Sequence, residues 1–116
     1  MKYEELQPIS HEELRHALLG AKAVEAARAL LRMALHERNL DFAERLCLDA
    51  LEDRRPEVKT AAIQSLGHLA RIHHALANAA VVDHLKKLQQ DPAWSGLAED
   101  ALDDILTFVP SQSRAN

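Results

Sequence analysis

The chain has 116 residues, a length that suits a single domain with its own hydrophobic core. Its 18 acidic and 14 basic residues give a formal net charge of −4, which argues against nucleic-acid binding, because that role needs an excess of Lys and Arg to neutralise phosphates. Ala and Leu supply most of the apolar residues, and aromatic residues make up only 3% of the chain, so the composition favours helices over strands.

The predicted elements, in chain order, are six segments whose apolar residues recur at helical spacing. They cover about residues 10–19, 22–37, 41–52, 56–73, 78–88 and 95–109. Ser10 and Glu13 match a capping box at the start of the first segment. Asn78 and Ser95 are expected to cap the fifth and the sixth segments. The tail, 110–116, is expected to fray.

Nothing in the sequence indicates export or membrane insertion. Residues 1–14, MKYEELQPISHEEL, lack the apolar centre of a signal peptide, and no apolar run is long enough to cross a membrane. The single cysteine, Cys47, has no second cysteine to pair with inside the chain, so the fold does not need an oxidising compartment. We therefore expect a cytoplasmic protein with no membrane partner.

The fourth and sixth segments carry the same pattern at an offset of 36 residues. The matching pairs are Pro56 and Pro92, Val58 and Trp94, Ala62 and Ala98, Leu66 and Leu102, and Leu69 and Ile105. A period near this length, with two helices in each unit, is typical of α-solenoids. We expect an all-α fold, a short right-handed α-solenoid of about six antiparallel helices. It forms one domain, 1–116, with an N-terminal helix at 10–19 and repeats at about 22–53, 55–91 and 92–109.

One stretch, LEDRRPEVKTAAIQSLGHLARI at residues 51–72, resembles a HEAT repeat. The residues that carry this resemblance are Leu51, Asp53, Pro56, Val58, Lys59, Ala61, Ala62, Leu66 and Gly67. HEAT-like repeats scaffold many kinds of protein, so the resemblance alone implies a fold and not a function.

A narrower resemblance is more informative. The combination of ERLCLDAL, GHLARIH, LKKLQQDP and AEDALDDI resembles small bacterial HEAT-like immunity proteins, which occur beside polymorphic or contact-dependent growth-inhibition toxins. Such proteins bind and neutralise a toxin domain. Members of that group usually carry an aromatic residue and a Gln at the start of the helix that contains the Cys-Leu pair. Phe42 and Glu44 stand near those places here, at a position that could touch the partner.

The expected sixth helix carries a cluster of acidic residues. Glu99, Asp100, Asp103 and Asp104 project away from its apolar stripe, and no Lys or Arg occurs between residues 91 and 110. Their two like-charge pairs at i,i+4 each weaken the helix by roughly 0.2–0.5 kcal/mol. The cluster is therefore either a solvated surface or, because proteins break local rules at functional sites, a surface for a basic partner.

Two further groups of residues are candidates for partner contacts. His68 faces outward on the fourth segment together with Arg71. On the third segment, Asp41, Arg45, Leu48 and Glu52 share one side of the helix. Leu48 is either an anchor for a partner or packs against a neighbouring repeat, because solenoid helices are buried on more than one side.

The sequence offers no catalytic or metal-binding pattern. It contains no Gly-rich phosphate loop, no nucleophile elbow and no convincing Cys-His pair. His68 and His73 are five residues apart and diverge on a helix, so they predict no metal site, and His73 is expected to be a hydrogen-bonded core residue. We expect no enzyme activity, no metal and no cofactor.

Taken with the resemblance, these features predict an immunity protein that binds a cognate toxin domain as a monomer in a 1:1 complex. The resemblance and the acidic cluster imply a basic toxin and favour a nuclease, whose active site or substrate surface is occluded. A HEAT-like adaptor without a toxin partner is the alternative. A DNA glycosylase of HEAT-like architecture is a third interpretation, which the lack of aromatic residues and of a basic groove opposes.

Overall fold

The computed structural model describes residues 6–110, which form six α-helices and no strand. The helices are α1 (His11–Leu19), α2 (Ala23–His36), α3 (Leu40–Ala50), α4 (Pro56–His73), α5 (Ala80–Gln89) and α6 (Ser95–Phe108). The expectation of an all-α fold is confirmed. Of the tail that was expected to fray, residues 111–116 lie outside the described range.

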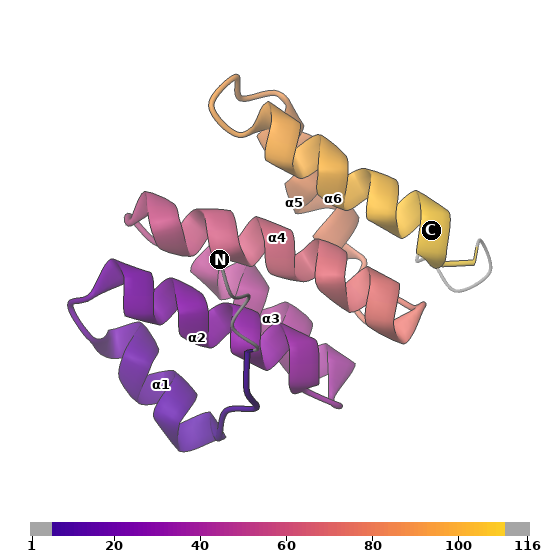
Figure 1. Ribbon diagram of the computed structural model, residues 1–116. Helices are drawn as coiled ribbons and strands as arrows, with labels where there is room; N and C mark the ends of the chain where they lie inside the picture. The colour runs from indigo at the N-terminus through magenta and orange to yellow at the C-terminus, as the bar shows by residue number, and fades with distance from the viewer. Residues whose placement is uncertain (1–5, 111–116) are drawn as a thin grey trace, which may run out of the picture.

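The helices pack as three successive pairs, α1 with α2, α3 with α4, and α5 with α6. The second members of the pairs also pack on one another, so α4 lies between α2 and α6. Figure 1 shows these three helices side by side in one layer, with α3 and α5 behind them. This two-layer stack is compatible with the α-solenoid that the 36-residue offset predicts.

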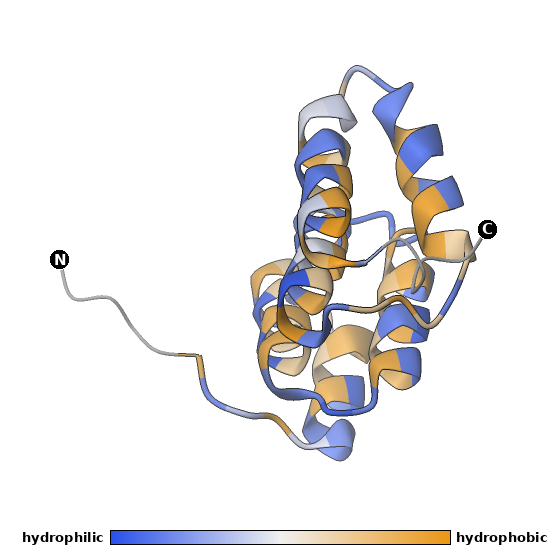
Figure 2. Ribbon diagram, turned by 90° about the vertical axis from the view of Figure 1, so that its right-hand side faces the viewer, coloured by the Kyte–Doolittle hydropathy of each residue, from blue (hydrophilic) through white to orange (hydrophobic). Residues whose placement is uncertain are grey.

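The core lies between the two layers, and α4 supplies more of it than any other described helix. The repeated pattern places the same face of α4 and α6 inside. Ala62 and its counterpart Ala98 are both fully buried, and so are Leu69 and Ile105. Figure 2 shows that the hydrophobic residues turn mainly toward neighbouring helices and the hydrophilic ones outward.

Arg55, just before Pro56, links the α3–α4 turn to the end of α1. Its guanidinium donates hydrogen bonds to the carbonyl oxygens of Leu18 (2.9 Å) and Gly20 (2.8 Å). It also donates two bonds of 2.9 Å to the Asp53 carboxylate. The hydrogen bond from Arg55 is the main reason that the pKa of Asp53 falls to about 2, although burial opposes the shift. The acidic turn of the HEAT-like stretch therefore fixes one helix pair against the next.

Of the three predicted side-chain caps, one forms and two do not. Ser10 accepts a hydrogen bond from the Glu13 amide (3.0 Å), as a capping residue does. The prediction that Asn78 and Ser95 cap helices was wrong. Asn78 uses its side-chain amide to bind α3, and Ser95 is already the first residue of α6. Asn39, which was expected only to mark a turn, caps α3. Its side-chain oxygen accepts a hydrogen bond from the Phe42 amide at 3.0 Å.

Candidate partner-binding surface

The acidic cluster of α6 divides into an exposed part and a packed part. Glu99, Asp100 and Asp103 are exposed, and none of the cations in residues 6–110 forms an ion pair with them. We call these three residues the acidic face. An uncompensated patch of one sign produces a field that attracts an oppositely charged partner and speeds its association.

Asp104 does not belong to the acidic face, contrary to the expectation that all four acids project outward. Its side chain is only 27% exposed and lies against α4, where its Oδ2 is 3.8 Å from the Arg71 Nε. A Cβ added at Gly67 would stand 2.6 Å from that oxygen. The carboxylate therefore occupies the space that the missing side chain of Gly67 leaves, and this brings α6 close to α4.

His68 and Arg71 lie beside Asp104 and join it in one cluster on α4 and α6. Burial, followed by the positive charge of Arg71, lowers the pKa of His68, while the negative charge of Asp104 opposes the change. A neutral imidazole is able to accept a hydrogen bond, and the Arg71 guanidinium donates one to the His68 Nδ1. Arg71 is exposed and His68 half-buried, so this cluster borders the acidic face and presents one cation next to it.

The α3 candidates are not brought to the same surface. Asp41 and Arg45 form an ion pair at 3.0 Å, and the hydrogen bond from Arg45 lowers the pKa of Asp41. Leu48 is half-buried and packs against the core, as the alternative interpretation expected. Because α3 lies in the layer behind α4 and α6 (Figure 1), these residues form a second region, separate from the acidic face.

Glu44 is buried, although its place in the sequence suggested a position that could touch the partner. It is 1% exposed, and its carboxylate accepts hydrogen bonds from the backbone amides of Ala77 (3.1 Å) and Asn78 (2.8 Å) and from the Asn78 side chain (2.9 Å). Burial raises the pKa of Glu44, and these hydrogen bonds oppose the shift. Glu44 therefore anchors the α4–α5 connection to α3 and is not a surface contact.

The histidines do not form a metal centre in the described part of the chain. Residues 6–110 contain no group of three or more His, Cys, Asp or Glu side chains placed to hold an ion. His73 is half-buried, but its buried Nε2 has no hydrogen-bond partner within that range, so the expectation of a hydrogen-bonded core histidine was wrong for this atom. None of the described helices is long and apolar enough to span a bilayer.

Comparison with known proteins identifies the family. No protein-family model matches the sequence, and neither does any curated protein. The chain superposes with a TM-score of 0.82 on a chain in the crystal structure of a CDI complex from Cupriavidus taiwanensis LMG 19424. The two chains are 33% identical, and the match covers 93% of this chain and 96% of the other.

The chain belongs to the immunity proteins of contact-dependent growth inhibition (CDI). The resemblance found in the sequence is thereby confirmed, and a role in toxin immunity follows at this general level. For a CDI immunity protein the useful distinction is between side chains that hold the helices together and side chains that remain available to a partner. Asp104 and Glu44 belong to the first kind, and the acidic face belongs to the second.

Proposed function

We propose that this CDI immunity protein neutralises a cognate toxin domain by binding it through the acidic face and covering its active site or substrate surface. The observation that carries the proposal is the set of three exposed acids on α6, Glu99, Asp100 and Asp103, which pair with no cation of residues 6–110, in a chain of this family. The protein acts as a binding partner in the cytoplasm, as a monomer in a 1:1 complex, and not as an enzyme.

The charge of the acidic face favours a nuclease as the toxin. A nuclease holds a polyanion, so its substrate surface must be rich in Lys and Arg. A rigid helix that presents three carboxylates offers such a surface the same charge as the phosphates and competes with the nucleic acid. No observation favours the alternative of a HEAT-like adaptor without a toxin partner.

The experiment replaces Asp100 and Asp103 by Lys and measures binding to the toxin domain encoded beside the chain's gene. Asp104 is left unchanged because it supports the α4–α6 contact. The control carries the same charge change at Asp49 and Asp83, which are exposed on α3 and α5. At low salt we expect the acidic-face variant to bind at least about tenfold more weakly and the control to bind like the parent.

The nuclease assignment has its own readout. The toxin domain is incubated with RNA and with DNA, and we expect the parent chain, but not the acidic-face variant, to block cleavage at equimolar concentration. A toxin that cleaves neither polymer would refute the nuclease assignment while leaving the immunity role in place. Equal protection of cells by the parent and the acidic-face variant would show that the acidic face is only a solvated surface.

A further inference from the structure

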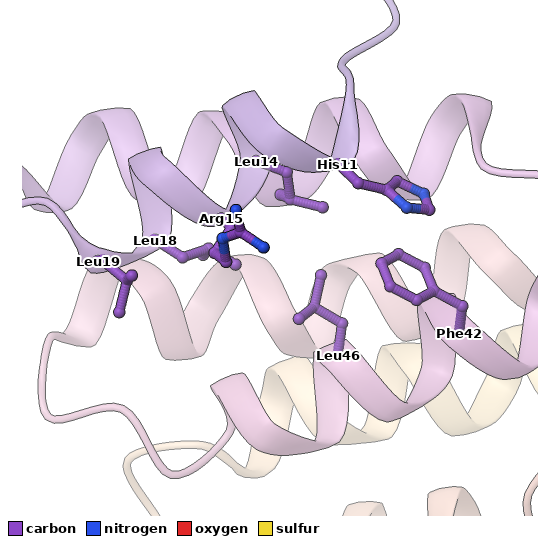
Figure 3. Close-up of a pocket in the computed structure, with 7 residues that line it drawn as sticks. All are labelled: His11, Leu14, Arg15, Leu18, Leu19, Phe42 and Leu46. Atoms are coloured by element: carbon purple, nitrogen blue, oxygen red, sulfur yellow. The ribbon is translucent and has the colours of Figure 1, made fainter.

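An apolar groove lies between α1 and α3 (Figure 3). The helix that carries the acidic face, α6, lies at the other end of the stack from α1 (Figure 1). The groove has a volume of about 420 Å³. The residues that line it are His11, Leu14, Arg15, Leu18, Leu19, Phe42 and Leu46. Leu14 is almost completely buried beneath it, whereas Leu19, at the end of α1, is 81% exposed. The groove exists because α1 packs on α2 and α3 packs on α4, so α1 and α3 meet only loosely.

One end of the groove is held in place without any ligand. The His11 ring stacks on the Phe42 ring, with centroids 4.2 Å apart and planes 13° from parallel. The His11 Nε2 is also 2.7 Å from a carboxylate oxygen of Glu37, and the other oxygen of that carboxylate accepts from the Asn39 amide at 3.0 Å. Because His11 and Phe42 are already held in place at this end of the groove, binding a partner there would cost little conformational entropy.

The groove differs from the acidic face in charge as well as in polarity. Arg15 is exposed on its lining, and among residues 6–110 no carboxylate pairs with it. An apolar cleft beside an exposed guanidinium matches a segment that combines an apolar side chain with a carboxylate.

We propose that the groove is a second contact for the toxin and takes an apolar side chain from a toxin segment whose neighbouring carboxylate pairs with Arg15. This inference rests on the proposed function, because it assumes a toxin bound to the same chain. Two separate contacts of opposite charge fix the orientation of the toxin, which a single acidic face would leave variable.

A second copy of the chain is the competing occupant. Leu106 is 65% exposed and lies one turn from the acidic face, so it combines an apolar side chain with nearby carboxylates. Its insertion into the groove of another copy would be a head-to-tail contact, which forms open chains unless the geometry closes a ring. Such a contact between two copies would also cover the acidic face, which the proposed function leaves free for the toxin. The toxin is therefore the better match.

The experiment uses two single variants with matched controls and the same toxin domain as above. Leu19→Gln removes the most exposed leucine of the lining, and Val24→Gln is its control because Val24 is 70% exposed on α2, outside the groove. Arg15→Glu reverses the charge on the lining, and Arg54→Glu is its control at another exposed site. We expect each groove variant to weaken toxin binding at least about tenfold, with both controls within about twofold of the parent.

The outcomes separate this proposal from the function on which it rests. If the groove variants bind like the parent while the acidic-face variant does not, the groove proposal is overturned and the proposed function stands. If the parent itself fails to bind the toxin, both are overturned. If sedimentation shows that the parent self-associates, that Leu19→Gln abolishes this, and that toxin binding is unchanged, the occupant is a second copy and the proposal fails.

Discussion

Replacing Glu44 by Gln should destabilise the chain much more than replacing Asp49 by Asn. Both changes turn a carboxylate on α3 into an amide, but Asp49 is exposed whereas Glu44 is 1% exposed. Gln keeps one acceptor oxygen for the Asn78 amide. Its NH₂ group then replaces Oε2, which shares the Ala77 amide with Oε1, so that amide keeps only its 3.1 Å bond to Oε1 and faces a second donor.

The magnitude follows from the three donors that Glu44 serves. A hydrogen bond to a charged group contributes about 1.5–3 kcal/mol, and a donor left without a partner costs about 1–3 kcal/mol. Ala77 is exposed, so water partly replaces the lost acceptor. We expect a loss of about 1–3 kcal/mol for Glu44→Gln and less than about 0.5 kcal/mol for Asp49→Asn. In a domain of this size, 1 kcal/mol lowers the Tm by about 4 °C.

The pH dependence of this loss gives a second, sharper test. Burial raises the pKa of Glu44 above 4.5. A group whose pKa is raised by folding contributes stability that is fully present below its unfolded pKa and is lost as the pH rises through its folded pKa. The deficit of Glu44→Gln relative to the parent should therefore be larger at pH 4 than at pH 7.

Urea unfolding followed by circular dichroism measures both variants at the two pH values, and toxin affinity is measured well below the melting temperature. We expect Glu44→Gln to bind the toxin like the parent, because its carboxylate does not reach the surface. Equal stability of the two variants would refute the role of Glu44 as an anchor. A larger deficit at pH 7 would show that hydrogen bonding to the carboxylate outweighs its burial, and lost affinity would restore Glu44 as a partner contact.

Three further predictions concern stability. Folding lowers the pKa of Asp53 to about 2, so its contribution is present above about pH 4 and is lost as the pH falls toward 2. Asp53→Asn should remove about 1 kcal/mol at pH 7, after allowance for solvent screening, and almost nothing at pH 2 in urea unfolding. Gly67→Ala should stay within about 1 kcal/mol of the parent in the same assay, because the gain in helix propensity offsets displacement of the Asp104 carboxylate, whereas a loss above 2 kcal/mol would mean that α6 itself moves. Glu99→Lys removes one like-charge pair, so it should raise the free energy of unfolding by a few tenths of a kcal/mol and the Tm slightly. A lower Tm would show that the acidic face supports the fold.

The starts of α1 and α4 were predictable because short-range chemistry sets them. Pro56 starts α4, and Ser10 caps α1 through contacts within a few residues along the chain. The fold class was predictable for a related reason, since the apolar stripes of the fourth and sixth segments repeat in the same register. These signals depend on one helix or on one pair of helices at a time.

The parts of the site that could not be predicted depend on how helices meet. A single helical wheel places Asp104 beside Asp100, but it does not show that α4 lies on that flank and that Gly67 leaves room there. Likewise, the donors that bind Glu44 lie 33 and 34 residues away in a connection without a repeating pattern. One feature of the sequence, the adjacent pair Leu18 and Leu19, does point to the groove. Because the helical period is 3.6 residues, the adjacent Leu18 and Leu19 diverge by about 100°, and in the structure Leu19 is left exposed.

The two proposed contacts depend on different forces, so salt should separate them. The acidic face acts through exposed charges, whose reach falls as the Debye length shrinks from about 30 Å at 0.01 M salt to about 8 Å at 0.15 M. At the groove, the contact with Leu19 acts through burial of apolar surface, which salt at these concentrations does not weaken, whereas the ion pair proposed for Arg15 does depend on salt. Charge reversal at Asp103 should therefore flatten the salt dependence of toxin affinity, whereas Leu19→Gln should lower the affinity by a similar factor at every salt concentration. If Leu19→Gln flattened that dependence instead, the groove would be acting through charge, and the apolar anchor assigned to it would be wrong.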